Sequence, residues 1–277
     1  MAGPLSAFLP WIEAWDLVPE GEPFETDTRS RLLRVSRRAK PCMLKVATDV
    51  EEIRGASLMA WWAGAGVARV VAHDGPALLL ERAAEAPSLA AMSRQGQDRE
   101  ATEILCGTIA ELHRPRGARP PAGLPNLKTW FQALASQSMV DRRLAEGSAI
   151  AQDLLRTSEG ETVLHGDIHH ANVLYFGEAG WRAIDPKGLI GERAYDYANI
   201  FRNPDQESAL VSGRLEERLD QVSRLADLDP QRLLRWATAH SALSAAWSIE
   251  DGCSPAWSFA VLGALLEKLD RTAGLFA

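Results

Sequence analysis

The stretch from Val163 to Asp185, which reads VLHGDIHHANVLYFGEAGWRAID, decides the fold and the chemistry of this chain. Three of its residues carry side-chain oxygens at a meaningful spacing: Asp167, Asn172 five positions later, and Asp185. Asp167 stands in a tight HGD turn, where a rigid loop can hold a carboxylate that orients a substrate hydroxyl and accepts its proton. Asn172 supplies a neutral oxygen and Asp185 a charged one, and hard cations such as Mg²⁺ prefer these ligands.

A turn within this stretch brings two of these residues together. The sequence GEAG lies between Phe176 and Trp181 and predicts a hairpin of two short strands. We therefore expect Asn172 and Asp185, at the ends of the hairpin, to lie side by side. Kinases use a base and two metal ligands at this spacing to transfer the γ-phosphoryl group of a nucleotide. The stretch thus predicts phosphoryl transfer that depends on ATP and Mg²⁺.

The segments on either side divide the chain into two regions. Short apolar runs predict strands at 31–35, 42–47, 67–72 and 77–80, with a helix near 50–62. Apolar positions at three- and four-residue spacing predict helices at 97–113, 126–146, 206–226, 230–249 and 256–270. We predict an α+β, bilobal protein: a small β-rich lobe over residues 1–83 that binds the phosphates, and a larger helical lobe over 84–277 that carries the catalytic loop, metal site and substrate site.

Lys45 stands in the apolar run PCMLKVA, which would bury its stem while its ammonium reaches a pocket. A strand-edge lysine with its charge in solvent is the alternative. Glu51 and Glu52 open the predicted helix shortly afterwards, and kinases use a helix carboxylate to hold the lysine that grips the α- and β-phosphates. We choose Glu52 as this partner. Glu51 stays open, as does an acidic helix start that compensates only the helix dipole.

The sequence gives weaker signals for the other parts of the predicted nucleotide site. The sequence contains neither GxGxxG nor GxxxxGK[ST], so neither a Rossmann nor a Walker-type phosphate loop is supported. Hydroxyls that could contact phosphates from a hairpin, or merely form a polar turn, belong to Thr26, Thr28 and Ser30. The run ALLLERA ends an apolar strand at Glu81 to Ala83, where the backbone could bind adenine between the lobes or simply enter a loop.

Composition restricts the partners and the compartment. The net charge of −7 argues against a nucleic-acid binder and suits a cationic small molecule better. Cys42, Cys106 and Cys253 lack the paired spacing of a zinc site and predict reduced thiols. The N-terminus has no basic flank or apolar core of a signal peptide, and no later stretch reaches the roughly 18 apolar residues of a membrane span. We therefore expect a cytoplasmic protein.

Three histidines, His165, His169 and His170, invite a zinc site as an alternative. Their spacing is not HExxH, and Gly166 argues against the continuous helix that such a motif needs. We interpret His165 as a residue that shapes the loop. His169 and His170 either shield charge near the transferred phosphate or are solvated.

The stretch HGDIHHANVLYF followed by AIDP resembles the aminoglycoside phosphotransferase branch of the protein-kinase-like fold. Further similarity to the branch of streptomycin 6-phosphotransferases and hydroxyurea phosphotransferases lies in KVATDVEEIRGA, LLLERA, AIDPKGLIGERAYDYANIF and DPQRLLRWATAHSALSAAW. The resemblance implies ATP and Mg²⁺ in a cleft between two lobes, with Asp167 as base, Asn172 and Asp185 as metal ligands, and Lys45 on the phosphates. IDP replaces the DFG of protein kinases, so no activation-loop switch is implied.

The same resemblance implies a streptomycin-type substrate, whose guanidinium groups would bind carboxylates. Candidates for this contact are Asp196, Glu250 and Asp251, with Trp247 as a flat wall. Alternatives are a loop-bracing role for Asp196, a solvated helix end for Glu250 and Asp251, and a core position for Trp247. Alternative functions are a kinase of another metabolite or antibiotic such as hydroxyurea, and an inactive nucleotide-binding protein.

Overall fold

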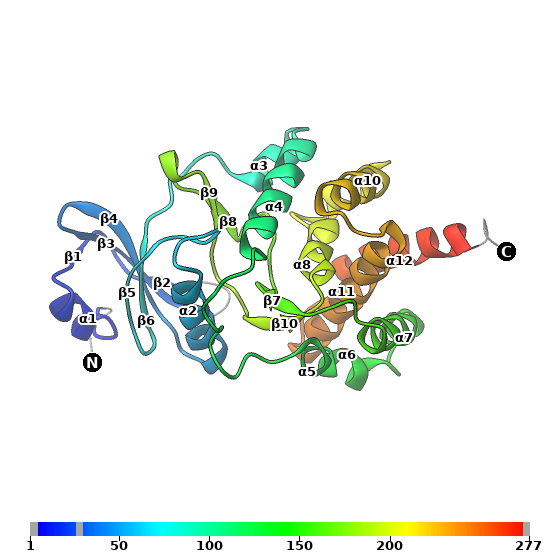
Figure 1. Ribbon diagram of the computed structural model, residues 1–277, viewed down its shortest axis with the longest axis horizontal. Helices are drawn as coiled ribbons and strands as arrows, with labels where there is room; N and C mark the ends of the chain where they lie inside the picture. Colours follow the sequence, from blue (N-terminus) through cyan, green and yellow to red (C-terminus); the bar gives the residue numbers. More distant parts are fainter. Residues whose placement is uncertain (1–4, 26–29, 274–277) are drawn as a thin grey trace.

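The N-terminal part of the chain forms an antiparallel sheet at one end of the molecule (Figure 1). The computed structural model describes residues 5–25 and 30–273. Within these ranges the sheet has six strands in the order β1-β3-β4-β6-β5, and β2 also pairs with β3. The elements are α1 (Leu9–Ala14), β1 (Val18–Pro19), β2 (Phe24–Glu25), β3 (Arg31–Arg37), β4 (Lys40–Val46), β5 (Val70–Asp74) and β6 (Ala77–Glu81).

Strand β4 lies inside this sheet and turns alternate side chains to opposite faces. Cys42, Leu44 and Val46 pack into an apolar cluster on one face. Met43 and Lys45 lie on the other face, where both line a cavity. The period of two residues along a strand therefore places the lysine of the PCMLKVA run at the cavity.

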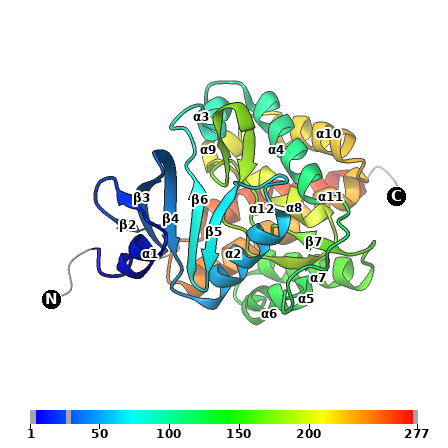
Figure 2. The same ribbon diagram turned by 60° about the vertical axis from the view of Figure 1, so that its left-hand side comes forward.

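Helix α2 (Val50–Trp62) lies between the sheet and the helical region (Figure 2). It begins at Asp49, whose carboxylate accepts a hydrogen bond from the backbone N–H of Glu52 (2.9 Å). Gly55 stands inside the helix, and a Cβ atom there would overlap the carbonyl oxygen of Pro186. This glycine allows α2 to approach the backbone directly after Asp185, which brings the first turn of the helix to the site.

The rest of the chain is mostly helical and is built around α11 (Pro230–Glu250), which packs against α7, α8 and α12. Asp229 caps α11 and Pro230 occupies its first turn, a favourable helix start. The helices around it are α3 (Leu89–Arg94), α4 (Asp98–Leu112), α5 (Leu127–Trp130), α6 (Gln132–Gln137), α7 (Arg142–Arg156), α8 (Ala194–Ala198), α9 (Gln206–Ala209), α10 (Arg214–Ala226) and α12 (Ala256–Ala273), with the 3₁₀ turn η2 (Asn199–Arg202) after α8. Among the described helices, none has the length and apolar character needed to cross a bilayer.

Two small antiparallel sheets carry the central stretch. Strand β7 (Thr162–Leu164) pairs with β10 (Leu189–Gly191), and β8 (Val173–Tyr175) pairs with β9 (Trp181–Ala183) through a 3₁₀ turn, η1 (Gly177–Ala179). The predicted hairpin is confirmed. The pairing continues past the strands, where Ile184 donates its N–H to the carbonyl of Asn172 (2.9 Å).

The expected β-rich start and helical remainder are confirmed, but two helix predictions were wrong in extent. The segment 126–146 contains α5, α6 and the start of α7, because Asp141 caps a new helix by accepting the N–H of Arg143 (2.8 Å). The segment 206–226 contains α9 and α10, which are separated at Gly213, where φ is +80°. Both segments kept helical periodicity across the breaks, so spacing alone did not reveal them.

Candidate active site

A cavity of about 750 Å³ opens between the sheet and the β8–β9 hairpin. The sheet contributes Leu32 and Met43, and the hairpin region contributes Leu174 and Ile184, so two apolar faces oppose each other. Such a slot has the character of a site for a flat aromatic ring.

The strand end predicted to bind adenine lies along this cavity, where both Glu81 and Ala83 contribute to its wall. The carboxylate of Glu81 accepts the backbone N–H of Arg69 (2.9 Å) and is therefore occupied within the protein. The next residue, Ala84, donates its N–H to the carbonyl of Tyr175 (2.8 Å), which ties this segment to the hairpin. The N–H groups of Glu81 and Arg82 are also occupied, by the carbonyls of Arg69 (3.0 Å) and Pro41 (3.3 Å), so the N–H of Ala83 is the backbone donor of this segment that is suited to a ligand.

Lys45 closes the inner end of the cavity with two carboxylates. Its Nζ lies 2.5 Å from Oδ1 of Asp185 and forms an ion pair with Glu52, while Lys45 itself is 7% exposed. Glu51, the alternative partner, instead pairs with Lys187 (2.8 Å). A lysine held by one helix carboxylate and one carboxylate at the cavity is poised to exchange the second for phosphate oxygens.

Asp185 occupies an unusual backbone position at the end of the hairpin. Its φ is +57°, in the left-handed region that non-glycine residues rarely adopt. The residue lines the cavity, whereas the strand before it is paired and partly buried. Local strain of this kind is kept where the surrounding structure enforces it, frequently at functional sites.

The loop that carries Asp167 is braced from beneath by Asp196, on helix α8. The Asp196 carboxylate accepts the backbone N–H groups of His165 (2.9 Å) and Gly166 (2.8 Å), and it bonds to Nε2 of His113 (2.8 Å). Burial raises the pKa of Asp196, but the hydrogen bonds that its carboxylate accepts from His113 and from the Gly166 N–H outweigh this effect, so the pKa is lowered. Asp196 is 2% exposed, so of the two predicted roles the structure supports the bracing of the loop and not a substrate contact.

His165 joins the catalytic loop to the end of the hairpin. Its Nε2 bonds to the carbonyl of Ile184 (2.8 Å), and its Nδ1 accepts the N–H of Asp167 (3.2 Å). This pair of partners requires a neutral imidazole with its proton on Nε2. Burial lowers the pKa of His165 in agreement with that state. The structure thus places His165 as the residue that shapes the loop.

The other two histidines do not form a metal site with it. His169 lies beside Asp167, with its Nε2 3.8 Å from Oδ1 of that carboxylate, and burial lowers the pKa of His169. His170 is buried without a hydrogen-bond partner for either nitrogen, and burial lowers its pKa to about 3. Within residues 5–25 and 30–273 no group of three or more His, Cys, Asp or Glu side chains is arranged to hold a metal.

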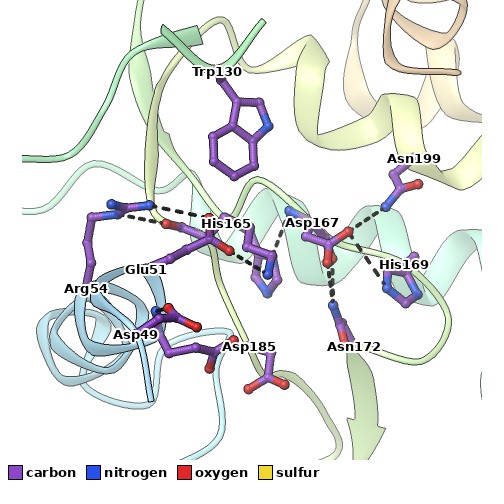
Figure 3. A network of polar contacts seen from close by, with 12 residues as sticks. Asp49, Glu51, Arg54, Trp130, His165, Asp167, His169, Asn172, Asp185 and Asn199 are labelled. Atoms are coloured by element: carbon purple, nitrogen blue, oxygen red, sulfur yellow. Dashed lines mark hydrogen bonds and ion pairs between the residues drawn. The ribbon is translucent and has the colours of Figure 1, made fainter. Parts of the chain in front are cut away.

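Two asparagine amides hold the carboxylate of Asp167 (Figure 3). Asn172 Nδ2 donates to the Asp167 backbone oxygen (2.8 Å) and to Oδ2 (3.3 Å), while Asn199 Nδ2 donates to Oδ1 (3.0 Å). Asn203 in turn donates to Oδ1 of Asn199 (2.8 Å), which fixes the orientation of that amide. Asn199 was not predicted. Its place three residues after Asp196, one turn further along the same helical segment, is the sequence feature that could have suggested it.

The remaining oxygen of Asn172 is available to a cation. Its Nδ2 makes both side-chain hydrogen bonds, which leaves Oδ1 free, and the hairpin brings its backbone next to the residue preceding Asp185. One amide oxygen and one carboxylate are too few for a closed metal cage. They suit Mg²⁺, which keeps waters and completes its coordination with substrate phosphates.

A second cavity, of about 200 Å³, lies on the other side of Asp167. Trp247 lines it together with Trp130, and the two rings meet edge to face at 5.4 Å. Glu250 and Asp251 do not line this cavity; they are exposed at the end of α11, where Glu250 accepts a hydrogen bond from Ser136 (3.3 Å). The structure therefore brings Trp247 to the base and places the two carboxylates further out.

Residues 14–252 match the sequence model of the family described as "Aminoglycoside/hydroxyurea antibiotic resistance kinase". The chain belongs to this kinase family. It is 47% identical over 246 residues to streptomycin 3''-kinase of Klebsiella pneumoniae, which covers 87% of this chain and 92% of that protein. It is 30% identical over 254 residues to a streptomycin 6-kinase of Streptomyces griseus, covering 87% and 81% of the two chains.

A solved structure shows the same fold. Aminoglycoside phosphotransferase APH(4)-Ia, in a ternary complex with ADP and hygromycin B, superposes with a TM-score of 0.65 at 15% identity, covering 95% of this chain and 96% of that chain. The predicted kinase-like fold and membership of the aminoglycoside/hydroxyurea branch are both confirmed. As a member of this kinase family, the protein is a phosphotransferase that uses ATP.

One residue predicted to contact phosphate, Ser30, lies away from the larger cavity. Ser30 is fully buried, its Oγ has no hydrogen-bond partner, and it does not line the cavity. The structure therefore gives no support to a phosphate contact by Ser30. Thr26 and Thr28, suggested with it, lie outside the described residues.

Proposed function

We propose that this protein is a streptomycin phosphotransferase that moves the γ-phosphoryl group of ATP to a hydroxyl of the antibiotic with the help of Mg²⁺. The observation that carries this proposal is the position of Asp185 and Asp167 on two separate cavities, one large and mainly apolar, the other small and lined by aromatic and polar groups. The 47% identity to a streptomycin 3''-kinase supports the choice of acceptor. We propose that the two lobes divide after Ala83.

In this proposal the larger cavity holds the nucleotide. The adenine ring lies between the apolar faces and bonds to the carbonyl of Glu81 and the N–H of Ala83, since the N–H of Glu81 is occupied by Arg69. Lys45 then binds the α- and β-phosphates, because its ammonium lies at the inner end of the cavity and Glu52 holds it there. Glu52 lies in the first turn of α2, so movement of that helix would directly shift the phosphate grip.

Asn172 Oδ1 and the Asp185 carboxylate would hold Mg²⁺ in this site. When bound, the ion neutralises charge on the β- and γ-phosphates during transfer. Asp185 would exchange its contact with Lys45 for the cation, since a phosphate-bound lysine no longer needs that carboxylate. Two protein ligands plus phosphates match the way in which Mg²⁺ is normally held.

Asp167 acts on the acceptor. Its carboxylate is held by Asn172 and Asn199, so it can orient the acceptor hydroxyl toward the γ-phosphorus without reorganising. A bond forms between the hydroxyl oxygen and the γ-phosphorus, the bond from that phosphorus to the β,γ-bridging oxygen breaks, and ADP leaves. The hydroxyl proton passes to Asp167. The products are ADP and the phosphorylated acceptor.

The cationic groups of streptomycin would meet Glu250 and Asp251 at the exposed end of α11. The carbonyl ends of this 21-residue helix add partial negative charge at the same place. Trp247, one turn earlier, forms a wall for the antibiotic between these carboxylates and the base. Since the reaction consumes ATP, we propose a cytoplasmic location.

The test is ATP consumption by the purified protein with streptomycin, other aminoglycosides and hydroxyurea, followed by mass analysis of the acceptor. We expect streptomycin to gain one phosphoryl group, and the higher identity to the 3''-kinase than to the 6-kinase favours the 3'' hydroxyl. NMR of the product identifies the position. Turnover with hydroxyurea alone would move the assignment to the other branch of the family. Nucleotide binding without turnover of any acceptor would identify an inactive kinase-like protein.

A further inference from the structure

The small cavity beside Asp167 is lined by groups that donate hydrogen bonds rather than by carboxylates. Helix α11 contributes His240, Ser244 and Trp247, at positions i, i+4 and i+7 of one helical face. Lys187 and Arg202 bring two cationic side chains to the same space, and among the described lining residues Asp167 is the sole acid. The charge of Lys187 is taken up by Glu51 (2.8 Å), whereas that of Arg202 is not matched in this way.

Arg202 is held in place without an acidic partner. Its Nη2 donates to Ser258 (3.0 Å), and its guanidinium lies 4.5 Å from the ring centre of Trp257. Its Nε is enclosed without a hydrogen-bond partner, and no carboxylate of the described chain lies within ion-pair distance. Burial lowers the pKa of Arg202 to about 10 against the opposing effect of Asp167, so the side chain remains cationic at neutral pH. A charged donor placed in this way favours an oxygen-rich ligand.

His240 adds a neutral polar group to the same inner end. It is 3% exposed, and its Nδ1 is buried without a hydrogen-bond partner. Burial lowers the pKa of His240 to about 3, assisted by the charge of Arg202, so the imidazole is uncharged at neutral pH. A neutral imidazole offers one donor and one acceptor; a hydroxyl group can use both, whereas a guanidinium, which only donates, can use the acceptor alone.

The opposite end of this helical face is acidic. Asp251 lies eleven residues after His240, and at about 1.5 Å per residue the two ends are roughly 16 Å apart along α11. Trp247 lies between them and contacts Trp130. The acceptor site therefore changes from cationic at the base, through aromatic, to acidic at the helix end.

We propose that Arg202 and His240 determine the orientation of the acceptor, by binding an uncharged, hydroxyl-bearing edge of the sugar next to Asp167 and excluding its guanidinium groups, which lie toward Glu250 and Asp251. This inference rests on the proposed function and deepens it. It assigns Arg202 and His240 a role in specificity that the phosphoryl-transfer motif does not contain.

The experiment measures steady-state kinetics of Arg202→Gln with streptomycin and ATP as varied substrates. If the inner pocket binds an uncharged edge, loss of the guanidinium removes a charge-assisted bond and raises the acceptor KM about tenfold or more, with the KM for ATP unchanged. If the pocket instead received a guanidinium group, removal of a like charge would lower the acceptor KM. An unchanged or lower acceptor KM therefore overturns the inference.

Two further variants keep the test decisive. Arg224→Gln removes an exposed arginine of α10 whose partner is Asp220, and it should change neither KM. If Arg202→Gln does not fold, as judged from its thermal unfolding, His240→Leu carries the same test, with a higher acceptor KM expected. A wild-type protein that phosphorylates no acceptor refutes the proposed function and this inference with it, whereas an active wild type with unaffected variants refutes this inference alone.

Discussion

The two cavities that flank the catalytic loop are built in different ways. The cavity proposed for the nucleotide is lined mainly by apolar side chains, and its cations are matched within the protein: Lys45 pairs with Glu52 and Asp185, and Arg82 pairs with Glu20, while the guanidinium of Arg34 lies over the ring of Phe24. The cavity proposed for the acceptor is smaller, about 200 Å³ against about 750 Å³, and its Arg202 has no carboxylate partner among the described residues. A site that is electrically balanced by its own residues suits a ligand that all kinases share. An unbalanced site demands a particular ligand to complete it, so we expect specificity to reside in the acceptor cavity.

The strongest test of this separation is Asp167→Ala. Because Asp167 lines the acceptor cavity and does not line the nucleotide cavity, we expect kcat to fall by about 10²- to 10⁴-fold, the usual contribution of a general base, with ATP affinity retained. Single-turnover kinetics and a nucleotide-binding titration measure the two effects. Asp220→Asn, an exposed change on α10, is the control. Activity retained in the alanine variant would remove Asp167 from the role of base.

The reverse effect is expected for Lys45→Met. Loss of the phosphate contact should lower kcat/KM for ATP by about a hundredfold or more while acceptor binding persists. The change also leaves Glu52 buried without its cation, so the free energy of unfolding should fall by about 3–5 kcal/mol. Lys45→Met combined with Glu52→Gln should recover much of the stability but none of the activity. Denaturant unfolding measures the change in stability, and steady-state kinetics measure the change in kcat/KM for ATP. A loss of streptomycin binding in Lys45→Met would contradict the separation of the two cavities.

Asn199→Ala probes the support of the base. One hydrogen bond to the Asp167 carboxylate is lost, so we expect kcat to fall about tenfold, with the KM for ATP nearly unchanged. If Asn199 had only a structural role, its loss would lower the free energy of unfolding without lowering kcat selectively at an unchanged KM for ATP. Asn203→Ala removes the group that orients Asn199 and should show a weaker form of the same effect. Equal loss of ATP affinity in both variants would contradict a positioning role.

The smallest effect concerns the packing of α2 against the nucleotide site. Gly55→Ala places a methyl group against the carbonyl of Pro186, so we expect a loss of about 1–3 kcal/mol in stability and a higher KM for ATP as Glu52 shifts. Gly107→Ala is the matched control, since that helical glycine in α4 has open space around its Cβ position, and it should stabilise by about 0.5–1 kcal/mol. Thermal unfolding compares the pair. A neutral Gly55→Ala would show that α2 can move without affecting the site.

The sequence was most informative where function depends on residues close together along the chain. Asp167, Asn172 and Asp185 lie within one loop and one hairpin, so their spacing predicted their proximity before the structure was known. Lys45 was found because a charged residue stood out in an apolar strand. Lys45 contacts Glu52 rather than Glu51 because of the direction in which α2 turns each side chain. Two adjacent glutamates in the sequence do not reveal that direction.

The sequence did not predict the roles of residues that depend on the packing of distant segments. Asn199 and Arg202 lie on the η2 turn, which has no pattern of its own, and they reach the base only because α8 is packed against α11. For Asp196 the resemblance offered both a substrate contact and a loop-bracing role, and its buried bonds to the catalytic loop favour the bracing role. Helix breaks at Asp141 and Gly213 were hidden by apolar spacing that continues across them.

The sequence by itself indicated the reaction, because the proposed base and the two proposed metal ligands lie on one loop and hairpin and need only local geometry to meet. Tertiary structure alone decided what surrounds the base on the acceptor side. His240 and Trp247 lie far along the chain from Asp167, and they line one cavity only because α11 runs through the centre of the helical region. Local spacing can specify a chemical step, whereas the shape and charge of a pocket depend on how distant helices pack.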